Sequence, residues 1–216
     1  MSERTEATIE EVDQETSTLL RVKLHTDDAT LSRYTTAGQV IVVRPNETEQ
    51  LYLAIASSPG DGHLEILMGP GAAAKIDPKI GQTLTIDAPM GRGFDVDMAK
   101  GNDVLLFAVG SAIAPMRPLI QLLRADRSAY GRITLYVGAH TEEDFAFRGE
   151  FEDWRRDRID IVQSISKPWV QHRFTDDAPP VDNAVAYVCG MKPMMEAVTE
   201  ALTTAGMPPE RIGKNW

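Results

Sequence analysis

The sequence predicts two domains of different class, a β-barrel followed by an α/β domain with a Rossmann-like parallel sheet. Short apolar segments separated by glycine and proline turns fill residues 19–100, and this rhythm is typical of an all-β barrel or sandwich. From residue 101 to 216, apolar strands alternate with helical patterns, which predicts a parallel sheet with right-handed crossovers. A length of 216 residues allows one large or two small domains.

The first domain is expected to consist mainly of strands. Strands are predicted at residues 19–24, 40–43, 51–56, 63–68 and 83–86, with one short helix at 71–76. Residues 1–18 are acidic and polar, so we assign them to an N-terminal extension that precedes the barrel.

The second domain is expected to alternate strand and helix. Strands are predicted at residues 104–109, 133–137, 159–164 and 185–188, and helices at 115–124, 147–157 and 193–205. The segment 167–183 is polar and contains prolines, so we expect a loop without a helix there.

Composition excludes several classes of protein. The net charge of −10 and pI of about 4.9 argue against nucleic acid as a partner, since phosphate binding needs a basic face. Arg155, Arg156 and Arg158 form a local basic run, for which a solvated helix face is favoured over a binding patch. A single cysteine excludes a disulfide framework or a four-cysteine metal site, and no metal site is expected. We find no signal peptide and no membrane span, and expect a cytoplasmic protein.

Two small-residue turns are candidates for binding an anion. Residues 110–115 join a buried strand to a helix, where backbone N–H groups and the helix dipole favour a phosphate. Taken alone, a single glycine turn is a weak signal, and an ordinary tight turn is the alternative. Residues 69–74 form a similar turn in the first domain and suit a pyrophosphate, or a loop kept small for packing. Residues 88–94 resemble a strand exit and hinge between the domains.

The turn Cys189-Gly190-Met191 follows an apolar strand and precedes a helix. It therefore lies at the carboxyl edge of the predicted sheet, where open α/β sheets bind ligands. The thiol has no neighbouring histidine or aspartate in the sequence to activate it, so a buried small apolar side chain is favoured over a nucleophile.

In this order, the motifs resemble those of the ferredoxin–NADP⁺ reductase-like flavoprotein superfamily. Residues 53–59 resemble its flavin-facing strand, 77–84 and 88–94 the end of the barrel, 110–119 the pyridine-nucleotide pyrophosphate loop, 147–151 the helix after the adenosine side, and 189–195 the nicotinamide-side motif. The resemblance covers residues 19–216. The branch it resembles most is the FAD/NAD(P)-binding oxidoreductases that include a plant "fruit protein".

The resemblance implies an FAD-binding barrel and an NAD(P)-binding α/β domain. For FAD it implies contacts from Leu53, Ala54, Ile55, Ala56, Ser57, Gly69, Gly71, Ala72 and Ala73. For the nicotinamide dinucleotide it implies Gly110, Ser111, Ala112, Pro115, His140, Gly190, Met191 and Met194. It places Cys189 and Trp216 beside the reacting rings, with Trp216 stacked on the flavin; the alternative is a C-terminal anchor packed against the barrel.

Several positions depart from the family pattern. Leu51 and Leu53 replace an arginine that neutralises the FAD pyrophosphate and a tyrosine that stacks on the ring. FAD is then expected to rest mainly on backbone groups of residues 53–57 and 71–73. Ala112 replaces a glycine, and its methyl is expected to crowd a dinucleotide or resist a positive φ. The segment between Ser166 and Val185 is short, which suggests a lost crossover helix.

The leading function is a flavin-dependent NAD(P)H oxidoreductase that passes electrons to a separate acceptor, which the sequence does not identify. The alternative is a non-catalytic flavin- or nucleotide-binding module that regulates or binds other proteins. His140 lies where NADP-using relatives place an arginine. A mostly neutral histidine is a weak partner for a 2′-phosphate, so no strong preference for NADPH is expected.

Overall fold

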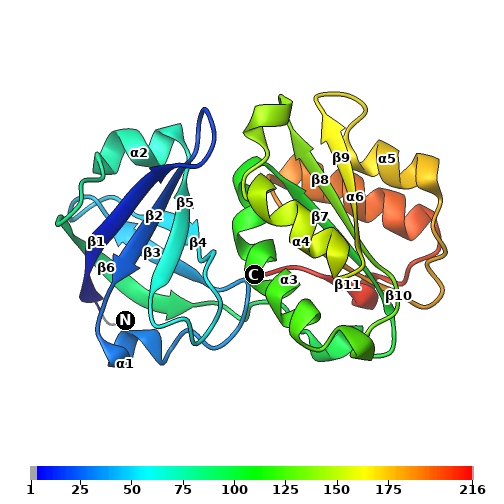
Figure 1. Ribbon diagram of the computed structural model, residues 1–216, viewed down its shortest axis with the longest axis horizontal. Coiled ribbons are helices and arrows are strands. Elements are labelled where there is room, and N and C mark those ends of the chain that lie inside the picture. Colours follow the sequence, from blue (N-terminus) through cyan, green and yellow to red (C-terminus); the bar gives the residue numbers. More distant parts are fainter. Residues whose placement is uncertain (1–3, 216) are drawn as a thin grey trace.

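Two sheets of different kind organise residues 4–215, the part of the chain that the computed structural model describes (Figure 1). The first is antiparallel, in the order β4-β3-β6-β1-β2-β5. Its strands are β1 (Arg4–Gln14), β2 (Leu20–His25), β3 (Val40–Arg44), β4 (Leu51–Ala54), β5 (Leu64–Met68) and β6 (Thr83–Met90). The second is parallel, in the order β11-β10-β7-β8-β9. Its strands are β7 (Asp103–Val109), β8 (Ile133–Ala139), β9 (Ile159–Ile165), β10 (Ala184–Cys189) and β11 (Ile212–Gly213). The predicted fold class is confirmed.

The first sheet curls until its two edge strands, β4 and β5, meet. An antiparallel bridge joins Ile55 to Ile66, and the Ala56 N–H donates to the Glu65 carbonyl over 2.6 Å. Apolar side chains from every strand fill the interior. The short helices α1 (Asp28–Leu31) and α2 (Pro70–Ile76) complete this barrel.

The N-terminal segment belongs to the barrel, so the prediction of an extension over residues 1–18 is wrong for Arg4–Gln14. β1 pairs with β2 on one side and with β6 on the other. Ala7 and Ile9 point into the core and are essentially inaccessible to solvent. Acidic residues flank Ala7 and Ile9 in the sequence, so these two apolar residues were too few to predict a strand. The first sheet ends at Met90 and the second begins at Asp103, and a boundary near residue 100 stays our proposal.

Both faces of the parallel sheet are covered by helices, which explains its continuous apolar strands. The helices are α3 (Ile113–Ala125), α4 (Phe151–Arg156), α5 (Val170–Asp177) and α6 (Lys192–Thr204). Val104, Leu106 and Ala108 of β7 pack with α3 and α4. Leu105 and Phe107 of the same strand point to the other face and pack with α5 and α6.

Helix α5 corrects the expectation that segment 167–183 is a loop and that a crossover helix is lost. Val170 and Phe174, one turn apart, bury their side chains against the sheet. The Phe174 ring lies edge-on to Phe107 and Tyr136, with centroids 5.7 and 6.0 Å away. With only these inward residues in the first two turns, the helix has little apolar signal in the sequence.

The hairpin tip between β1 and β2 reaches from the barrel to the second domain (Figure 1). The Phe147 N–H donates to Glu15 Oε1 over 2.6 Å, and the Ser17 hydroxyl donates to Asp144 Oδ1 over 2.5 Å. The Ser17 hydrogen bond holds the pKa of Asp144 below its ordinary value. This contact bridges the two domains at one side of their interface.

Arg117 on α3 forms a second bridge between the domains. Its guanidinium donates to Glu150 Oε1 at 2.7 Å, to Glu65 Oε1 at 2.8 Å and to the Ala56 carbonyl at 3.1 Å. It also lies 4.6 Å from the centre of the Phe147 ring. Glu65 and Ala56 belong to the barrel, so Arg117 ties α3 to the strands that close it.

The segment after β11 forms a third bridge, running back between the two domains (Figure 1). The Asn215 side chain donates from Nδ2 to the Gly38 carbonyl of the barrel over 3.1 Å. Close by, the Tyr187 hydroxyl of β10 donates to the Asp95 carbonyl over 2.5 Å, and the Phe94 and Tyr187 rings meet edge-on. These bridges fix how the carboxyl edge of the parallel sheet faces the barrel.

Candidate functional site

A cavity of about 530 Å³ lies where the barrel meets the carboxyl ends of β7 and β10. Its lining residues are Val40, Tyr52, Leu53, Ala54, Leu67, Val109, Ser111, Ala112, Ala114, Pro115, Cys189, Gly190, Met191 and Asn215. None of these described side chains is charged. The cavity lies at the sheet edge where open α/β folds bind ligands.

Three predicted motifs, far apart in the sequence, meet in this cavity. The flavin strand contributes Leu53 and Ala54, the pyrophosphate loop contributes Ser111, Ala112 and Pro115, and the nicotinamide-side turn contributes Cys189, Gly190 and Met191. Tyr52 and Met191 remain largely exposed, so the cavity has an apolar rim. Mostly apolar walls of this kind suit the ring systems of organic cofactors.

The rest of the predicted flavin strand is turned into the barrel. The Ile55 and Ala56 N–H groups donate to the Gln39 and Glu65 carbonyls, and the buried Ser57 hydroxyl donates to the His63 carbonyl. These N–H groups are therefore occupied by barrel hydrogen bonds, and only the Leu53–Ala54 end of the strand faces the cavity.

The turn before α2 also differs from the expected phosphate cradle. Gly69 caps the helix without a side-chain hydrogen bond, and Pro70 follows it. The Ala72 and Ala73 N–H groups both donate to the Gly69 carbonyl, at 3.1 and 2.9 Å. None of these residues, nor Gly71, lines the 530 Å³ cavity.

The loop between β7 and α3 has the backbone geometry of an open strand-to-helix turn. Gly110 adopts a φ of +57°, which favours glycine, and nothing lies within 4 Å of where its Cβ would be. Ala112 has a φ of −67°. The expectation that its methyl would resist a positive φ is therefore wrong, because no positive φ is needed there. No side chain caps the α3 N-terminus, which leaves its dipole free to act on an anion.

Cys189 at the end of β10 is buried, with 5% of its surface exposed. Burial raises the pKa of its thiol to about 12, so the thiol stays protonated at neutral pH and has no nucleophilic thiolate. A Cβ at the next residue, Gly190, would come within 3.0 Å of Met194 Sδ. Met194 thus packs against the turn and is not among the residues that line the cavity.

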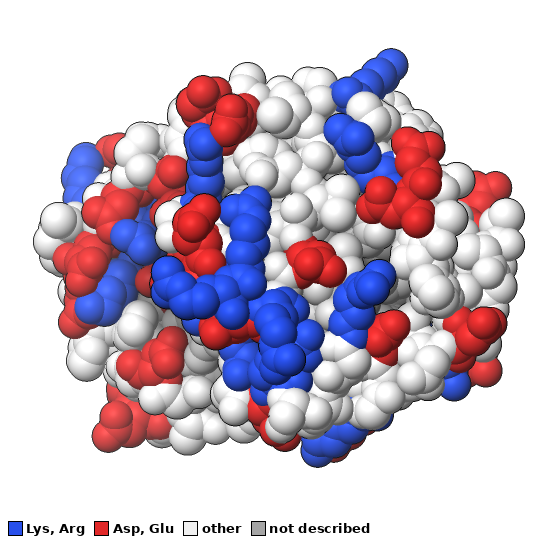
Figure 2. Space-filling view, turned by 45° about the vertical axis from the view of Figure 1, so that its right-hand side comes forward, with Lys and Arg blue, Asp and Glu red and all other residues white. Residues whose placement is uncertain are grey.

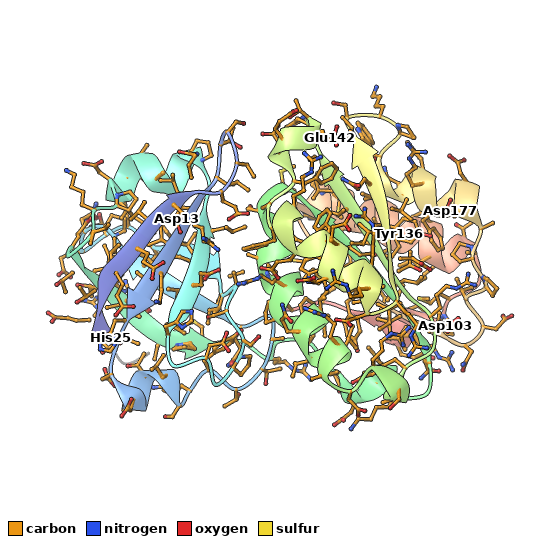
Figure 3. All side chains as sticks on the ribbon, in the orientation of Figure 1. Asp13, His25, Asp103, Tyr136, Glu142 and Asp177 are labelled. Atoms are coloured by element: carbon orange, nitrogen blue, oxygen red, sulfur yellow. The ribbon has the colours of Figure 1, made fainter. Side chains whose placement is uncertain are left out.

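The predicted adenosine side lies after β8 and is acidic. His140 is exposed and is followed by Glu142, Glu143 and Asp144 in one short turn. Figure 3 shows Glu142 at one extremity of the second domain, and Asp103, at the start of β7, at the other. The Arg148 guanidinium pairs with Glu142 at 2.5 Å, so this cation is already engaged by a carboxylate.

Six cavity residues were not among the predicted site residues: Val40, Tyr52, Leu67, Val109, Ala114 and Asn215. Val40, Tyr52 and Leu67 lie on strands beside core residues, and the hydrophobic pattern of the sequence does not distinguish cavity residues from core residues there. Asn215 is 2% exposed and enters the site only through the return of the C-terminal segment. The prediction for Trp216 falls outside the described residues.

A second cavity, of about 790 Å³, lies elsewhere. It is lined by Thr35, Thr36, Arg92, Gly93, Phe94, Asp95, Val96, Asp97, Leu122, Glu210, Ile212, Gly213 and Lys214. No predicted site residue contributes to it, and its mixed charges suit no single ligand class. We therefore place the candidate site in the smaller cavity.

Positive side chains gather on one face despite the acidic composition, as Figure 2 shows. Arg155 and Arg156 on α4 are paired with Glu152 and Asp153 of the same helix, at 3.8 and 2.7 Å. This pairing supports the interpretation of a solvated helix face. Within residues 4–215 no helix is long and apolar enough to cross a membrane, and no cluster of three metal-ligating side chains is found.

Known proteins resemble the chain in both sequence and fold. Residues 106–200 match the family model of the oxidoreductase NAD-binding domain. The gamma subunit of sulfhydrogenase 1 from Pyrococcus furiosus is 34% identical over 147 residues, covering 62% of this chain and 50% of that subunit. The chain thus spans half the length of this relative. The chloroplastic leaf-type ferredoxin–NADP reductase of Nicotiana tabacum is 25% identical over 162 residues, covering 65% and 44% of the two chains.

Solved structures share the whole fold. A ferredoxin–NADP⁺ reductase from Neisseria gonorrhoeae with bound FAD and NADP superposes with a TM-score of 0.85 at 16% identity, covering 99% of this chain and 98% of that one. A cytochrome P450 reductase from Amycolatopsis gives the same TM-score at 21% identity, covering 100% and 70%. These similarities establish the two-domain architecture.

Residues 106–200 thus match an oxidoreductase NAD-binding domain. The chain as a whole, a barrel joined to a parallel sheet with a cavity between them, has the two-domain fold of the ferredoxin–NADP⁺ reductase structures. Its membership of the branch with the plant "fruit protein" stays a prediction.

Proposed function

We propose that the chain is an FAD-dependent NAD(P)H oxidoreductase that passes electrons to a separate acceptor. The observation that carries this proposal is the meeting of the flavin strand, the pyrophosphate loop and the nicotinamide-side turn in one cavity. When bound, FAD supplies the hydride-accepting chemistry, and the protein positions the two rings.

The residues of the cavity suit hydride transfer rather than acid–base catalysis. Leu53, Ala54 and Pro115 provide apolar walls that exclude water. The protonated Cys189 thiol adds bulk beside the reacting rings without adding charge. The N-terminus of α3, which has no side-chain cap, directs the positive end of its dipole toward the nucleotide pyrophosphate.

FAD is proposed over FMN because the barrel motifs resemble those of FAD-binding relatives. The arginine expected at Leu51 is absent, and the Ala72 and Ala73 amides are engaged. A charge-assisted hydrogen bond contributes about 1.5–3 kcal/mol, so we expect the purified protein to lose FAD more readily than a relative with that arginine.

A separate protein is proposed as the electron acceptor. One relative, 26% identical over 199 residues, is the electron transfer subunit of dihydroorotate dehydrogenase B from Desulforamulus reducens. The gamma subunits of sulfhydrogenases also carry names of parts of larger assemblies. A cytoplasmic location stays a prediction from composition.

The test is to reconstitute the purified chain with FAD and with FMN, remove free flavin, and identify the retained flavin after acid release. NADH and NADPH oxidation is then followed with ferricyanide as an artificial acceptor. Ala54→Trp, which fills the flavin side of the cavity, should abolish flavin retention and turnover. Retained flavin without turnover would instead favour the alternative, a non-catalytic flavin-binding module. Retention of FMN alone would contradict the assignment of FAD.

A further inference from the structure

The amino-terminal edge of the parallel sheet carries arginines in the turns that lead into β8 and β9. The Arg127 guanidinium ties the two turns together, because it donates to backbone carbonyls in both of them. Those carbonyls belong to Tyr130, Gly131, Asp157 and Arg158, at 3.0, 2.8, 3.1 and 3.0 Å. Ile133 of β8 is paired with Ile159 of β9, so the residues just before them, Arg132 and Arg158, are neighbours on adjacent strands.

The carboxylates nearby leave the charges of Arg132 and Arg158 uncompensated. Asp157 is paired with Arg124 at 2.6 Å, and Asp103 Oδ1 accepts the backbone N–H of Arg132 at 2.7 Å. Among the described residues, no side-chain hydrogen bond or ion pair engages the guanidinium of Arg132 or of Arg158. Both side chains are exposed, so this edge presents positive charge to solvent in a chain of net charge −10.

The fold brings like charges together here. Burial and the charge of Arg158 hold the pKa of Arg127 below its ordinary value, and Asp160 offsets this only in part. Arg158 also has a φ of +60°, a backbone conformation that favours glycine or asparagine. Since the Arg158 side chain is exposed, packing in the core does not account for an arginine at this position.

The arginines of α4 are a different case, because Arg155 and Arg156 are paired with carboxylates of their own helix. Neither cavity described above includes Arg132 or Arg158, so the pair lies on an open surface rather than in an enclosed pocket for a small molecule. The net charge of −10 disfavours a long nucleic acid, which the rest of the surface would repel.

An acidic protein segment fits such a surface best, because guanidinium groups bind carboxylates in bidentate geometry and arginine is enriched at protein interfaces. We propose that Arg132 and Arg158 form a docking site for an acidic segment of a partner protein, with Arg127 positioning the two turns. An exposed pair of arginines supports a weak, salt-sensitive contact rather than a permanent one.

The position of this docking site keeps the cofactor cavity accessible. β8 runs over 7 residues, so at about 3.3 Å per residue the site lies about 20 Å from the carboxyl edge of the sheet. Asp103, which contacts the same turn, lies at the opposite extremity of the second domain from Glu142 (Figure 3). A partner held at this edge therefore leaves the entrance for a nicotinamide dinucleotide uncovered, and the inference does not depend on which flavin the chain binds.

The experiment measures the dissociation constant of a short fluorescein-labelled oligoglutamate peptide for the full chain by fluorescence anisotropy. Arg132→Gln removes one charge, and Arg158→Gly removes the other while fitting the φ of +60° without strain. Arg211→Gln is the matched control, because Arg211 also donates to a backbone carbonyl, that of Asp182 at 2.7 Å, but precedes β11 on the other side of the sheet. Labelled oligothymidylate is the second probe, with phosphates in place of carboxylates.

We expect each single variant to bind the peptide about threefold more weakly than the wild type and the double variant about tenfold more weakly. Arg211→Gln should bind as the wild type does, and high salt should remove the difference between wild type and double variant. The inference is overturned if the wild type does not bind the peptide, if the double variant binds it as well as the wild type, or if Arg211→Gln loses as much affinity. Tighter binding of oligothymidylate than of the peptide, lost in the double variant, would assign the edge to a phosphate ligand instead.

Discussion

Replacing Arg117 by methionine removes the ionic bridge between the domains while keeping much of the side-chain volume. The guanidinium donates to two carboxylates and one carbonyl, and the side chains of Arg117, Glu65 and Glu150 are 19%, 11% and 27% exposed. Breaking a buried ion pair costs about 3–5 kcal/mol because the remaining charge is left unpaired. Partial exposure lets water compensate, so we take the lower limit of about 3 kcal/mol.

For a chain of this length, about 3 kcal/mol corresponds to a fall in Tm of roughly 6–12 °C. Differential scanning calorimetry measures this directly, and it should also resolve two transitions if the domains no longer unfold together. The additional change Glu65→Gln removes the stranded carboxylate, so the double variant should recover part of the lost stability.

Arg124→Met is the matched control. Arg124 lies two turns further along α3 and pairs with Asp157 of its own domain at 2.6 Å, with side chains 23% and 41% exposed. A pair this exposed contributes at most about 1 kcal/mol, so its Tm should fall by no more than about 2–4 °C with a single transition. Equal effects of Arg117→Met and Arg124→Met would refute the role of Arg117 as the bridge between the domains.

Two further predictions concern the cavity and the adenosine side. Burial raises the pKa of Cys189 above its ordinary value of 9.0 to about 12, so the folded state keeps a proton that the unfolded state loses. The contribution of Cys189 to the free energy of unfolding should therefore be constant below pH 9 and decrease between about pH 9 and 12. Cys189→Ala should remove this decrease. If the free energies of unfolding of wild type and variant, measured by urea denaturation, decrease equally between pH 9 and 12, the raised pKa of Cys189 is contradicted. The ratio of kcat/KM for NADPH to that for NADH should stay below about a hundredfold in the wild type. Glu142→Gln should release Arg148 and raise this NADPH-to-NADH ratio by up to about fivefold. Glu143→Gln, which changes the neighbouring residue, should leave the ratio unchanged. The same ratio in both variants would show that Arg148 lies away from the 2′-phosphate.

The elements that the sequence predicts best are those with a long apolar signal. β7 is apolar on both faces because helices cover both sides of the sheet, and its type and position were predicted correctly. β1 was missed because only Ala7 and Ile9 mark its inward face among acidic residues. α5 was missed because Val170 and Phe174 carry its apolar face within a polar segment.

The candidate site was predictable where motifs are local and not where it depends on tertiary packing. The Ser111–Pro115 and Cys189–Met191 turns follow strands that end at the same sheet edge, so their meeting could be anticipated. The occupied amides of Ala56 and Ala73 could not, because their partners depend on how the barrel closes and how α2 begins. Asn215 was missed for the same reason, since it reaches the cavity only across the domain interface.

Anaerobic titration of the FAD-loaded protein with NADH tests the central claim most directly, because it requires both rings to meet in the one cavity. We expect the flavin absorbance to bleach in proportion to the NADH added and to return when ferricyanide is supplied. Ala54→Trp, at the flavin side of the cavity, should retain no flavin after the same loading and therefore show no flavin absorbance to bleach. A wild-type protein that holds FAD yet keeps its full flavin absorbance with both NADH and NADPH would contradict the account.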